Sequence, residues 1–219
     1  MPVFRTLPGL APYDATVDAM AAHAAAIRAG TADEEVWLLE HQSVLTGGTS
    51  AKQADLVNPG GIPVHHTGRG GQWTWHGPGQ RVAYVMLDLS RRRPDVRAYV
   101  HALEGWIIDV LGGLGIDGQR RDGNPGIWVP GEGRLDKVAA IGVRISRWVT
   151  WHGIAVNLDP AMDGFGAIVP CGVRDGGVTS LRRLGVDIDM TALDAALRDS
   201  FTRHFPDPDP DLAGKPDDQ

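Results

Sequence analysis

The stretch KVAAIGVRISRWVTWHGIAVNL, residues 137–158, contains two apolar runs, Lys137–Ile145 and Val149–Leu158, on either side of a short turn around Arg147. Two such runs with so short a connection predict a β-hairpin. Working outward, apolar residues at a spacing of two predict strands, and those at three and four predict helices. The strands are Glu35–Glu40, Ile62–His66, Arg81–Leu89 and Gly126–Val129, and the helices are Asp14–Gly30, Asp95–Leu114 and Asp189–Phe205. Hairpins with few helices predict an α/β fold, with a mixed sheet flanked by helices.

The size and charge of the chain exclude several classes of protein. Its 219 residues are 42% hydrophobic, which is typical of one large globular domain. We expect this domain to span residues 1–205, ahead of a disordered, acidic, Pro-rich tail over 206–219. No apolar run approaches the roughly 20 residues of a membrane span, so we expect no membrane partner. A single cysteine and no visible signal peptide predict a cytoplasmic protein, and we separately expect a monomer. The net charge of -6 argues against binding to nucleic acid.

A glycine-rich segment, RGGQWTWHGPGQ at residues 69–80, is the first candidate site. Gly70 and Gly71 allow the backbone to approach a ligand closely, and Pro78 restrains the chain after them. We expect a rigid loop that presents Arg69 and His76. Its glycine spacing matches neither a Walker loop nor a dinucleotide fingerprint, and a pair of ordinary hairpin turns is the plain alternative.

Two further candidates are the only cysteine, Cys171, and the lysine at the start of the hairpin, Lys137. Each has an ordinary structural interpretation, as a small buried hydrophobe and as a surface lysine beside a strand. Together they suggest a thiol activated by a nearby cation. Ala140 and Gly142 are two residues apart and therefore share one face of their strand, where they would leave a slot for an alkyl chain.

The histidines give a weaker signal. His76 and His152 are expected to be hydrogen-bonded histidines of the core, and His65 and His66 point to opposite faces of a strand. No group of side chains has the spacing of metal ligands, so we predict no metal. Clusters of arginine, including residues 91–93, are candidate docking patches for acidic proteins, or simply solvated surface.

These motifs, in this order, resemble the lipoyl(octanoyl) transferase family. The resemblance covers roughly residues 30–185 and rests on four segments. The first lies within residues 69–80 and consists of RGG at 69–71, Thr74 and HGPGQ at 76–80. The others are KVAAIG at 137–142, HGIAVN at 152–157 and PCG at 170–172. It implies a fold similar to the catalytic domains of biotin and lipoate protein ligases. It also implies transfer of an octanoyl group from octanoyl-acyl carrier protein to a lysine of a lipoyl domain, without a cofactor. The lipoyl domains are those of 2-oxoacid dehydrogenase complexes and of the glycine cleavage H protein.

The resemblance also assigns roles to residues. Cys171 would be the nucleophile that carries the acyl group as a thioester, and Lys137 would be its proton-transfer partner. The substrate-binding residues would be Arg69, Gly70, Gly71, Gln72, Trp73, Thr74, Trp75, His76, Ala140, Ile141, Gly142, Gly153, Ile154 and Ala155. Trp75 and Trp151 stand where the family usually has Tyr and Phe, which predicts an altered wall of the acyl pocket.

Three other functions remain open from the sequence. One is an ATP-dependent lipoate or octanoate ligase, although such ligases typically have His-Asp-x-Gly-Asn where this chain has His76-Gly77-Pro78-Gly79-Gln80. Another is an amidotransferase that moves the acyl group between lipoyl domains. The third is a non-catalytic module that binds a lipoyl domain or a fatty acid, because a fold alone does not determine function.

Overall fold

The computed structural model describes residues 1–169 and 176–209. Within these residues a seven-stranded mixed sheet has the order β1-β2-β6-β9-β8-β10, with β7 also paired to β8. A smaller three-stranded sheet has the order β4-β3-β5. The strands are β1 (Val3–Ala11), β2 (Glu35–His41), β3 (Val44–Gly47), β4 (Val64–His66), β5 (Trp73–His76), β6 (Gln80–Met86), β7 (Gly126–Pro130), β8 (Leu135–Ser146), β9 (Val149–Asn157) and β10 (Gly177–Val178).

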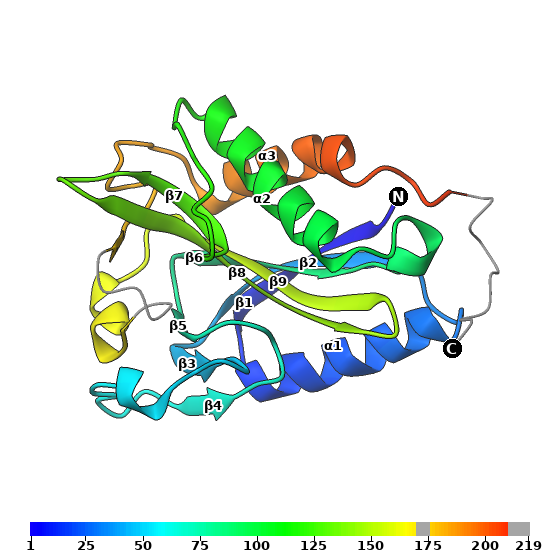
Figure 1. The fold of residues 1–219 in the computed structure, drawn as a ribbon, viewed down its shortest axis with the longest axis horizontal. Helices are drawn as coiled ribbons and strands as arrows, with labels where there is room; N and C mark the ends of the chain where they lie inside the picture. The colour runs from blue at the N-terminus through cyan, green and yellow to red at the C-terminus, as the bar shows by residue number, and fades with distance from the viewer. Residues whose placement is uncertain (170–175, 210–219) are drawn as a thin grey trace.

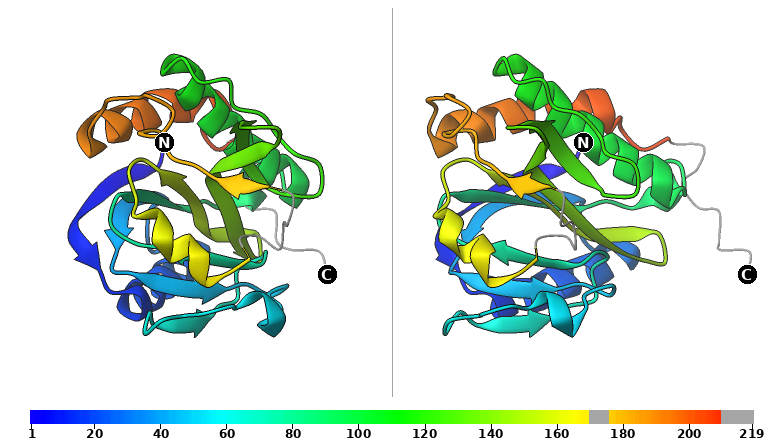
Figure 2. Two further views of the ribbon diagram at one scale, coloured as in Figure 1. Left: turned by 90° about the vertical axis from the view of Figure 1, so that its left-hand side faces the viewer. Right: turned by 60° about the vertical axis from the view of Figure 1, so that its left-hand side comes forward.

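Helices cover both faces of the large sheet. Helices α2 (Val96–Gly113) and α3 (Met190–His204) lie above it in Figure 1, and α1 (Tyr13–Arg28) lies below it. The main core fills the space under α2 and α3 and includes Leu103, Trp106 and Phe201, each fully buried. A second core packs α1 against the opposite face. Figure 2 shows that the small sheet lies on the same side as α1. The expected mixed sheet flanked by helices is confirmed.

Local signals account for several of the element boundaries. Asp95 and Asp189 are the N-caps of α2 and α3, and each carboxylate accepts a hydrogen bond from the backbone N–H three residues later. The predicted hairpin is confirmed, because Ser146 pairs with Val149 in an antiparallel β8–β9 ladder. Its two-residue turn places Arg147 and Trp148 at positive φ angles of 48° and 65°, as a type I′ turn requires.

The sequence prediction missed four strands: β1, β3, β5 and β10. Residues 69–80 do not form one loop, because Trp73–His76 is a strand that pairs with β3 and Gln80 begins β6. Three short 3₁₀ helices were also not expected: η1 (Gln53–Asp55), η2 (Leu89–Arg91) and η3 (Met162–Ala167).

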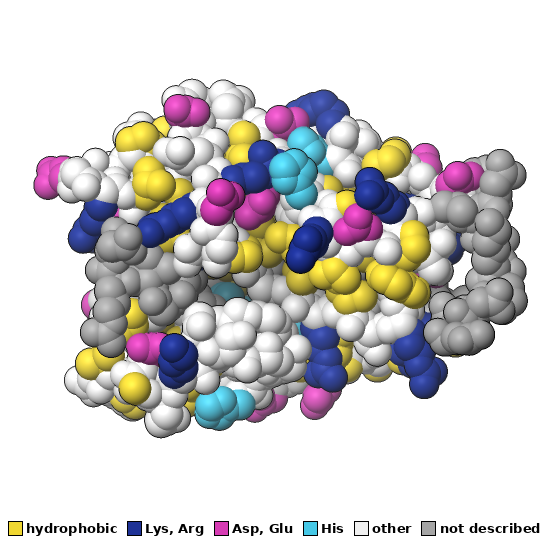
Figure 3. Space-filling model, viewed as in Figure 1, with side chains coloured by type: hydrophobic (Ala, Val, Ile, Leu, Met, Phe, Trp, Pro, Cys, Tyr) yellow, Lys and Arg dark blue, Asp and Glu magenta, His cyan; other side chains and the backbone are white. Residues whose placement is uncertain are grey.

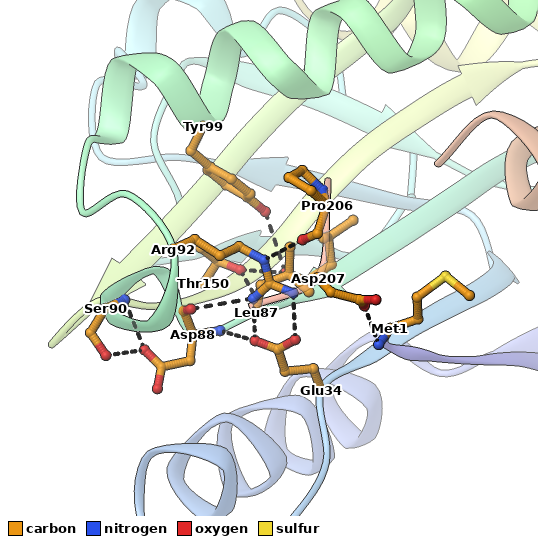
Figure 4. A network of polar contacts seen from close by, with 11 residues as sticks. Met1, Glu34, Leu87, Asp88, Ser90, Arg92, Tyr99, Thr150, Pro206 and Asp207 are labelled. Atoms are coloured by element: carbon orange, nitrogen blue, oxygen red, sulfur yellow. Dashed lines mark hydrogen bonds and ion pairs between the residues drawn. The ribbon is translucent and has the colours of Figure 1, made fainter. Parts of the chain in front are cut away.

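One candidate docking patch is in part structural. The Arg92 guanidinium forms a two-pronged ion pair with Glu34, with Nη1–Oε1 and Nη2–Oε2 distances of 2.5 and 2.7 Å (Figure 4). Glu34 is buried and the Arg92 side chain is only 10% exposed, and Arg92 Nε also donates to the carbonyl of Pro206. Asp207 pairs with the N-terminal amine of Met1. The backbone N–H of Asp209 donates to the carbonyl of Arg91 in η2, so residues 206–209 of the expected tail contact the end of η2 and the N-terminal residue.

Candidate active site

A cavity of about 520 Å³ is lined by the glycine-rich segment, β5, β8 and β9. Figure 3 shows a hollow in this region, between the part of the molecule that carries α2 and the part that carries the small sheet. Most of the residues singled out from the sequence line this cavity: Arg69, Gly70, Gly71, Gln72, Trp73, Thr74, His76, Lys137, Ala140, Ile141, Gly142, Gly153, Ile154 and Ala155. Three segments distant in the sequence thus meet around one space.

Trp75 is the exception among these residues. Its indole Nε1 donates to Ser43 Oγ at 2.9 Å, and its ring packs on Phe165 with the centroids 5.2 Å apart. It belongs to the separate core of the small sheet. Trp151 also lies outside the cavity wall and instead carries the Arg144 guanidinium over its ring, 4.7 Å from the centroid. Neither tryptophan is therefore among the described residues that line this cavity, and their effect on the acyl pocket stays a prediction.

Lys137 lines the cavity and is 5% exposed. Its ammonium Nζ donates to the carbonyl of Pro125 at 3.0 Å and lies over the ring of Trp128, 4.6 Å from the centroid. Cys171 lies outside the described residues, between Val169 and β10. The short strand β10 pairs in parallel with β8, with Val178 opposite Lys137. The chain that follows Cys171 is thus brought beside Lys137 within seven residues.

Arg69 stabilises the glycine-rich segment from inside. Its guanidinium donates to the carbonyls of Gly70, Thr46 and Gln72 and to the Thr46 hydroxyl, at 2.7 to 3.2 Å. The backbone of Gly70 adds a hydrogen bond to Val143 of β8, at 2.8 Å. These bonds fasten the segment to both sheets, so the cavity wall is held in place.

Gly142 has a role beyond the one expected. A Cβ atom at Gly142 would lie 3.1 Å from Arg69 Cδ and 3.1 Å from the carbonyl oxygen of Gly70. The missing side chain therefore makes room for the arginine and the loop, while Gly142 also lines the cavity. Ala140, on the same face, remains as the small residue of the expected slot.

His76 is held in a chain of amide hydrogen bonds. Gln80 Nε2 donates to the Trp75 carbonyl and to Asn157 Oδ1, so its Oε1 is the atom that faces His76 Nδ1, at 2.7 Å. His76 Nδ1 must then carry the proton, which leaves Nε2 as an acceptor. Burial, together with the nearby His41, lowers the pKa of His76 to about 3. The ring is neutral at pH 7 and has an orienting role.

A second polar pair lies behind the cavity. The hydroxyl of Tyr84, which lines it, donates to His41 Nε2 at 2.7 Å, while His41 Nδ1 donates to the carbonyl of Ala11. Burial lowers the pKa of His41 and raises that of Tyr84. His152 lines the cavity at a φ of 60°, and burial, followed by the charge of Arg69, lowers its pKa to about 3. These groups are uncharged, which suits a neutral, apolar ligand.

Sequence reasoning missed Pro125, Trp128 and Tyr84 as parts of this site. Trp128 stands in a short apolar run, where an aromatic residue is ordinarily part of a core, and only its cross-strand register with Lys137 gives it another role. Among the residues that the structure describes, no group of three or more His, Cys, Asp or Glu side chains could hold a metal ion. Over the same residues, no helix is long and apolar enough to span a membrane.

Comparison with known proteins identifies the family. Residues 12–202 match the family model of the lipoyl protein ligase A/B catalytic domain. An octanoyltransferase of Cereibacter sphaeroides is 56% identical over 213 residues, which cover 93% of this chain and 98% of that relative. An octanoyltransferase of Acidiphilium cryptum is 57% identical over 204 residues, 90% of each chain. This chain belongs to the octanoyltransferase family. It is therefore an enzyme of the acyltransferase class, in a family that modifies proteins by lipoylation.

Solved structures support the same fold. This octanoyltransferase-family chain superposes on a structure of lipoate-protein ligase A bound with ATP, with a TM-score of 0.68 at 16% identity. The match covers 93% of this chain and 85% of the ligase chain. A structure from a study of the bipartite lipoate protein ligase of Thermoplasma acidophilum and its E2 lipoyl domain gives the same TM-score and identity. That match covers 93% of this chain and 84% of the other. The biotin protein ligase of Aquifex aeolicus is more distant, with a TM-score of 0.51 at 10% identity over 92% and 68%.

Proposed function

We propose that this chain transfers an octanoyl group from octanoyl-acyl carrier protein to a lysine of a lipoyl domain, through a thioester on Cys171. The observation that carries the proposal is the cavity that Lys137 lines together with apolar side chains, in a chain more than half identical to octanoyltransferases. An octanoyl tail buried there would gain about 0.8 kcal/mol for each methylene removed from water.

The first half of the reaction would form the acyl-enzyme. Cys171 and Lys137 share one proton, and in the thiolate–ammonium form of this pair the thiolate attacks the octanoyl carbonyl on the carrier's pantetheine arm. The bond from the carbonyl carbon to the pantetheine sulfur then breaks, and the departing thiolate takes the proton back from the Lys137 ammonium. The register of β10 against Lys137 supports this pairing, because it brings the chain after Cys171 beside the amine.

The second half would pass the group to the target lysine. The target amine attacks the thioester carbonyl, and Lys137, now neutral, accepts the proton that this nitrogen releases. Cleavage of the bond to Cys171 Sγ restores the thiol, with the proton supplied by Lys137. Exchange of one thioester for another is nearly balanced and conversion of a thioester to an amide is downhill, so the sequence of steps requires no ATP.

The proposed partners are octanoyl-acyl carrier protein and the lipoyl domains of 2-oxoacid dehydrogenase complexes and the glycine cleavage H protein. Among the substrate-binding roles, Arg69 through Thr74 and His76 would form one wall of the acyl site, and Ala140–Gly142 and Gly153–Ala155 the other. A monomeric state and a cytoplasmic location stay predictions of the sequence.

The test is a transfer assay with purified octanoyl-carrier protein and a lipoyl domain, followed by mass spectrometry of the lipoyl domain. We expect one octanoyl group on its lysine without ATP. Modification only with free octanoate and ATP would instead identify a ligase. Donation from an octanoylated lipoyl domain but not from the carrier would identify an amidotransferase, and binding without any modification would identify a binding module.

A further inference from the structure

We propose that Trp128 is a positioning residue that holds the Lys137 amine in its working place in the wall of the cavity. The inference rests on the proposed function, because it assigns the purpose of this contact to the reaction of Lys137. Trp128 lies on β7, opposite Lys137 on β8, and both side chains are buried.

The Lys137 side chain is held by Pro125, Gly126 and Trp128, at the start of β7, and these three residues are called its seat. The carbonyl of Pro125 accepts a hydrogen bond from Nζ at 3.0 Å. Gly126 lies under the aliphatic stem, since a Cβ there would come within 3.2 Å of Lys137 Cε. The indole of Trp128 lies at the ammonium end, 4.6 Å from Nζ. Hydrogen bond, stem contact and aromatic face together define one conformation of a long side chain.

Trp128 is itself fixed on its other sides. Its indole Nε1 donates to the Asn124 carbonyl at 3.1 Å, which sets the direction of the ring. Its backbone exchanges two hydrogen bonds with Gln119, at 2.8 and 2.9 Å. A register shift between Ile127 and Trp128 places Trp128 opposite Lys137 rather than opposite Val138. Such irregularities re-aim side chains beside functional sites.

The physical argument is one of pre-organisation. A lysine stem has several rotatable bonds, and an amine displaced by about 1 Å from its reacting partner can lose about 100-fold in rate. The ring attracts the ammonium through its quadrupole, and Trp does this better than Phe. The guanidinium of Arg121 also lies over this ring, 4.8 Å from its centroid, so the indole contacts two cationic side chains, Arg121 and Lys137.

The test compares Trp128→Leu and Trp128→Phe with matched changes at Trp106. Trp106 is also fully buried and also donates Nε1 to a carbonyl, that of Leu197 at 2.9 Å, but it lies in the core between α2 and α3. We expect Trp128→Leu to slow acylation of Cys171 by octanoyl-carrier protein at least tenfold, with the KM for the carrier within twofold. Trp128→Phe should recover part of the rate, and Trp106→Leu should lower Tm while the rate per folded molecule is kept.

A second measurement does not depend on activity. The chain has three lysines, Lys52, Lys137 and Lys215, so ¹³C-lysine labelling gives few NMR signals, and Lys137→Arg assigns the one of interest. We expect the Lys137 Hε protons to be shifted upfield by the indole, and this shift to be lost in Trp128→Leu but kept in Trp106→Leu. A wild type that shows the shift but forms no acyl-enzyme, with the shift lost in Trp128→Leu, would support the seat while the proposed function fails. An unchanged shift, or equal rate losses at both tryptophans, would overturn the inference.

Discussion

Gly142 of β8 and Arg69 of the glycine-rich segment are in contact across the cavity wall, and a Cβ at Gly142 would lie 3.1 Å from Arg69 Cδ. The arginine in turn donates hydrogen bonds to Gly70, Thr46 and Gln72. The position of the loop therefore depends on the absence of a side chain on the strand. A Cβ in place of the hydrogen on Gly142 Cα would therefore change the position of the cavity wall.

Gly142→Ala should displace Arg69 and the loop. Because overpacking costs about 1–3 kcal/mol, we expect a loss of unfolding free energy in that range and a lower kcat/KM for octanoyl-carrier protein. The control is Gly112→Ala in α2, where a Cβ meets no atom within 4 Å and Ala favours the helix. Denaturant unfolding and steady-state kinetics measure both effects. Equal behaviour of the two variants would contradict the role given to Gly142.

Ala140 should set the room for the acyl tail. We expect Ala140→Leu to lower the rate with octanoyl-carrier protein and to shift preference toward hexanoyl or butanoyl groups. Each methylene that no longer fits loses about 0.8 kcal/mol, or about fourfold in kcat/KM. Competition between carriers of different chain length measures this directly. A preference that stays at eight carbons would place the tail away from Ala140.

Stability should fall in mild acid because of the buried histidines. His76 and His152 have pKa values lowered from 6.5 to about 3, mainly by burial, so the unfolded chain binds protons between pH 6.5 and pH 3 that the folded chain does not. The unfolding free energy should therefore be full above about pH 6.5 and fall as pH drops below it, by up to about 1.4 kcal/mol per pH unit per histidine.

Urea unfolding between pH 7.5 and 5 measures this slope. His76→Asn should make it shallower, whereas His101→Asn, a change at an exposed position, should leave it unchanged. A flat dependence of the unfolding free energy on pH in the wild type would mean that the folded chain binds protons at these rings as readily as the unfolded chain does.

Arg92 should act on stability and not on docking. Arg92→Met leaves Glu34 buried without its ion-pair partner, which costs about 3–5 kcal/mol. The double variant Glu34→Met, Arg92→Met should recover much of that loss. Arg93→Met is the control, because the Arg93 side chain is 80% exposed. Thermal unfolding and the KM for the carrier separate the two roles. A raised KM in Arg92→Met without loss of stability would show that Arg92 docks the carrier after all.

The sequence predicted those parts of the fold that local signals determine. The starts of two helices at Asp95 and Asp189 and the hairpin around Arg147 follow from a few neighbouring residues, and the structure has all three, with both aspartates as N-caps. Strand β5 was missed because Trp73–His76 is surrounded by glycines and proline. Its strand character comes from pairing with β3, nearly thirty residues earlier.

The site shows the same division. The segments that line the cavity could be named from the sequence, because their motifs stand at recognisable positions. The contact of Gly142 with Arg69 and the seat of Lys137 on Trp128 could not, because each depends on the register between strands or on a loop far away in the chain. The surroundings of Trp75 and Trp151 could not be predicted for the same reason, since each packs away from the cavity.

The most direct test of the account is intact-protein mass spectrometry after incubation with octanoyl-acyl carrier protein, without ATP. We predict an octanoyl adduct on the wild type that hydroxylamine releases, that is absent from Cys171→Ala and that forms far more slowly in Lys137→Met. An adduct that persists in Cys171→Ala, or a wild type that forms none while still modifying a lipoyl domain from free octanoate and ATP, would contradict the thioester mechanism.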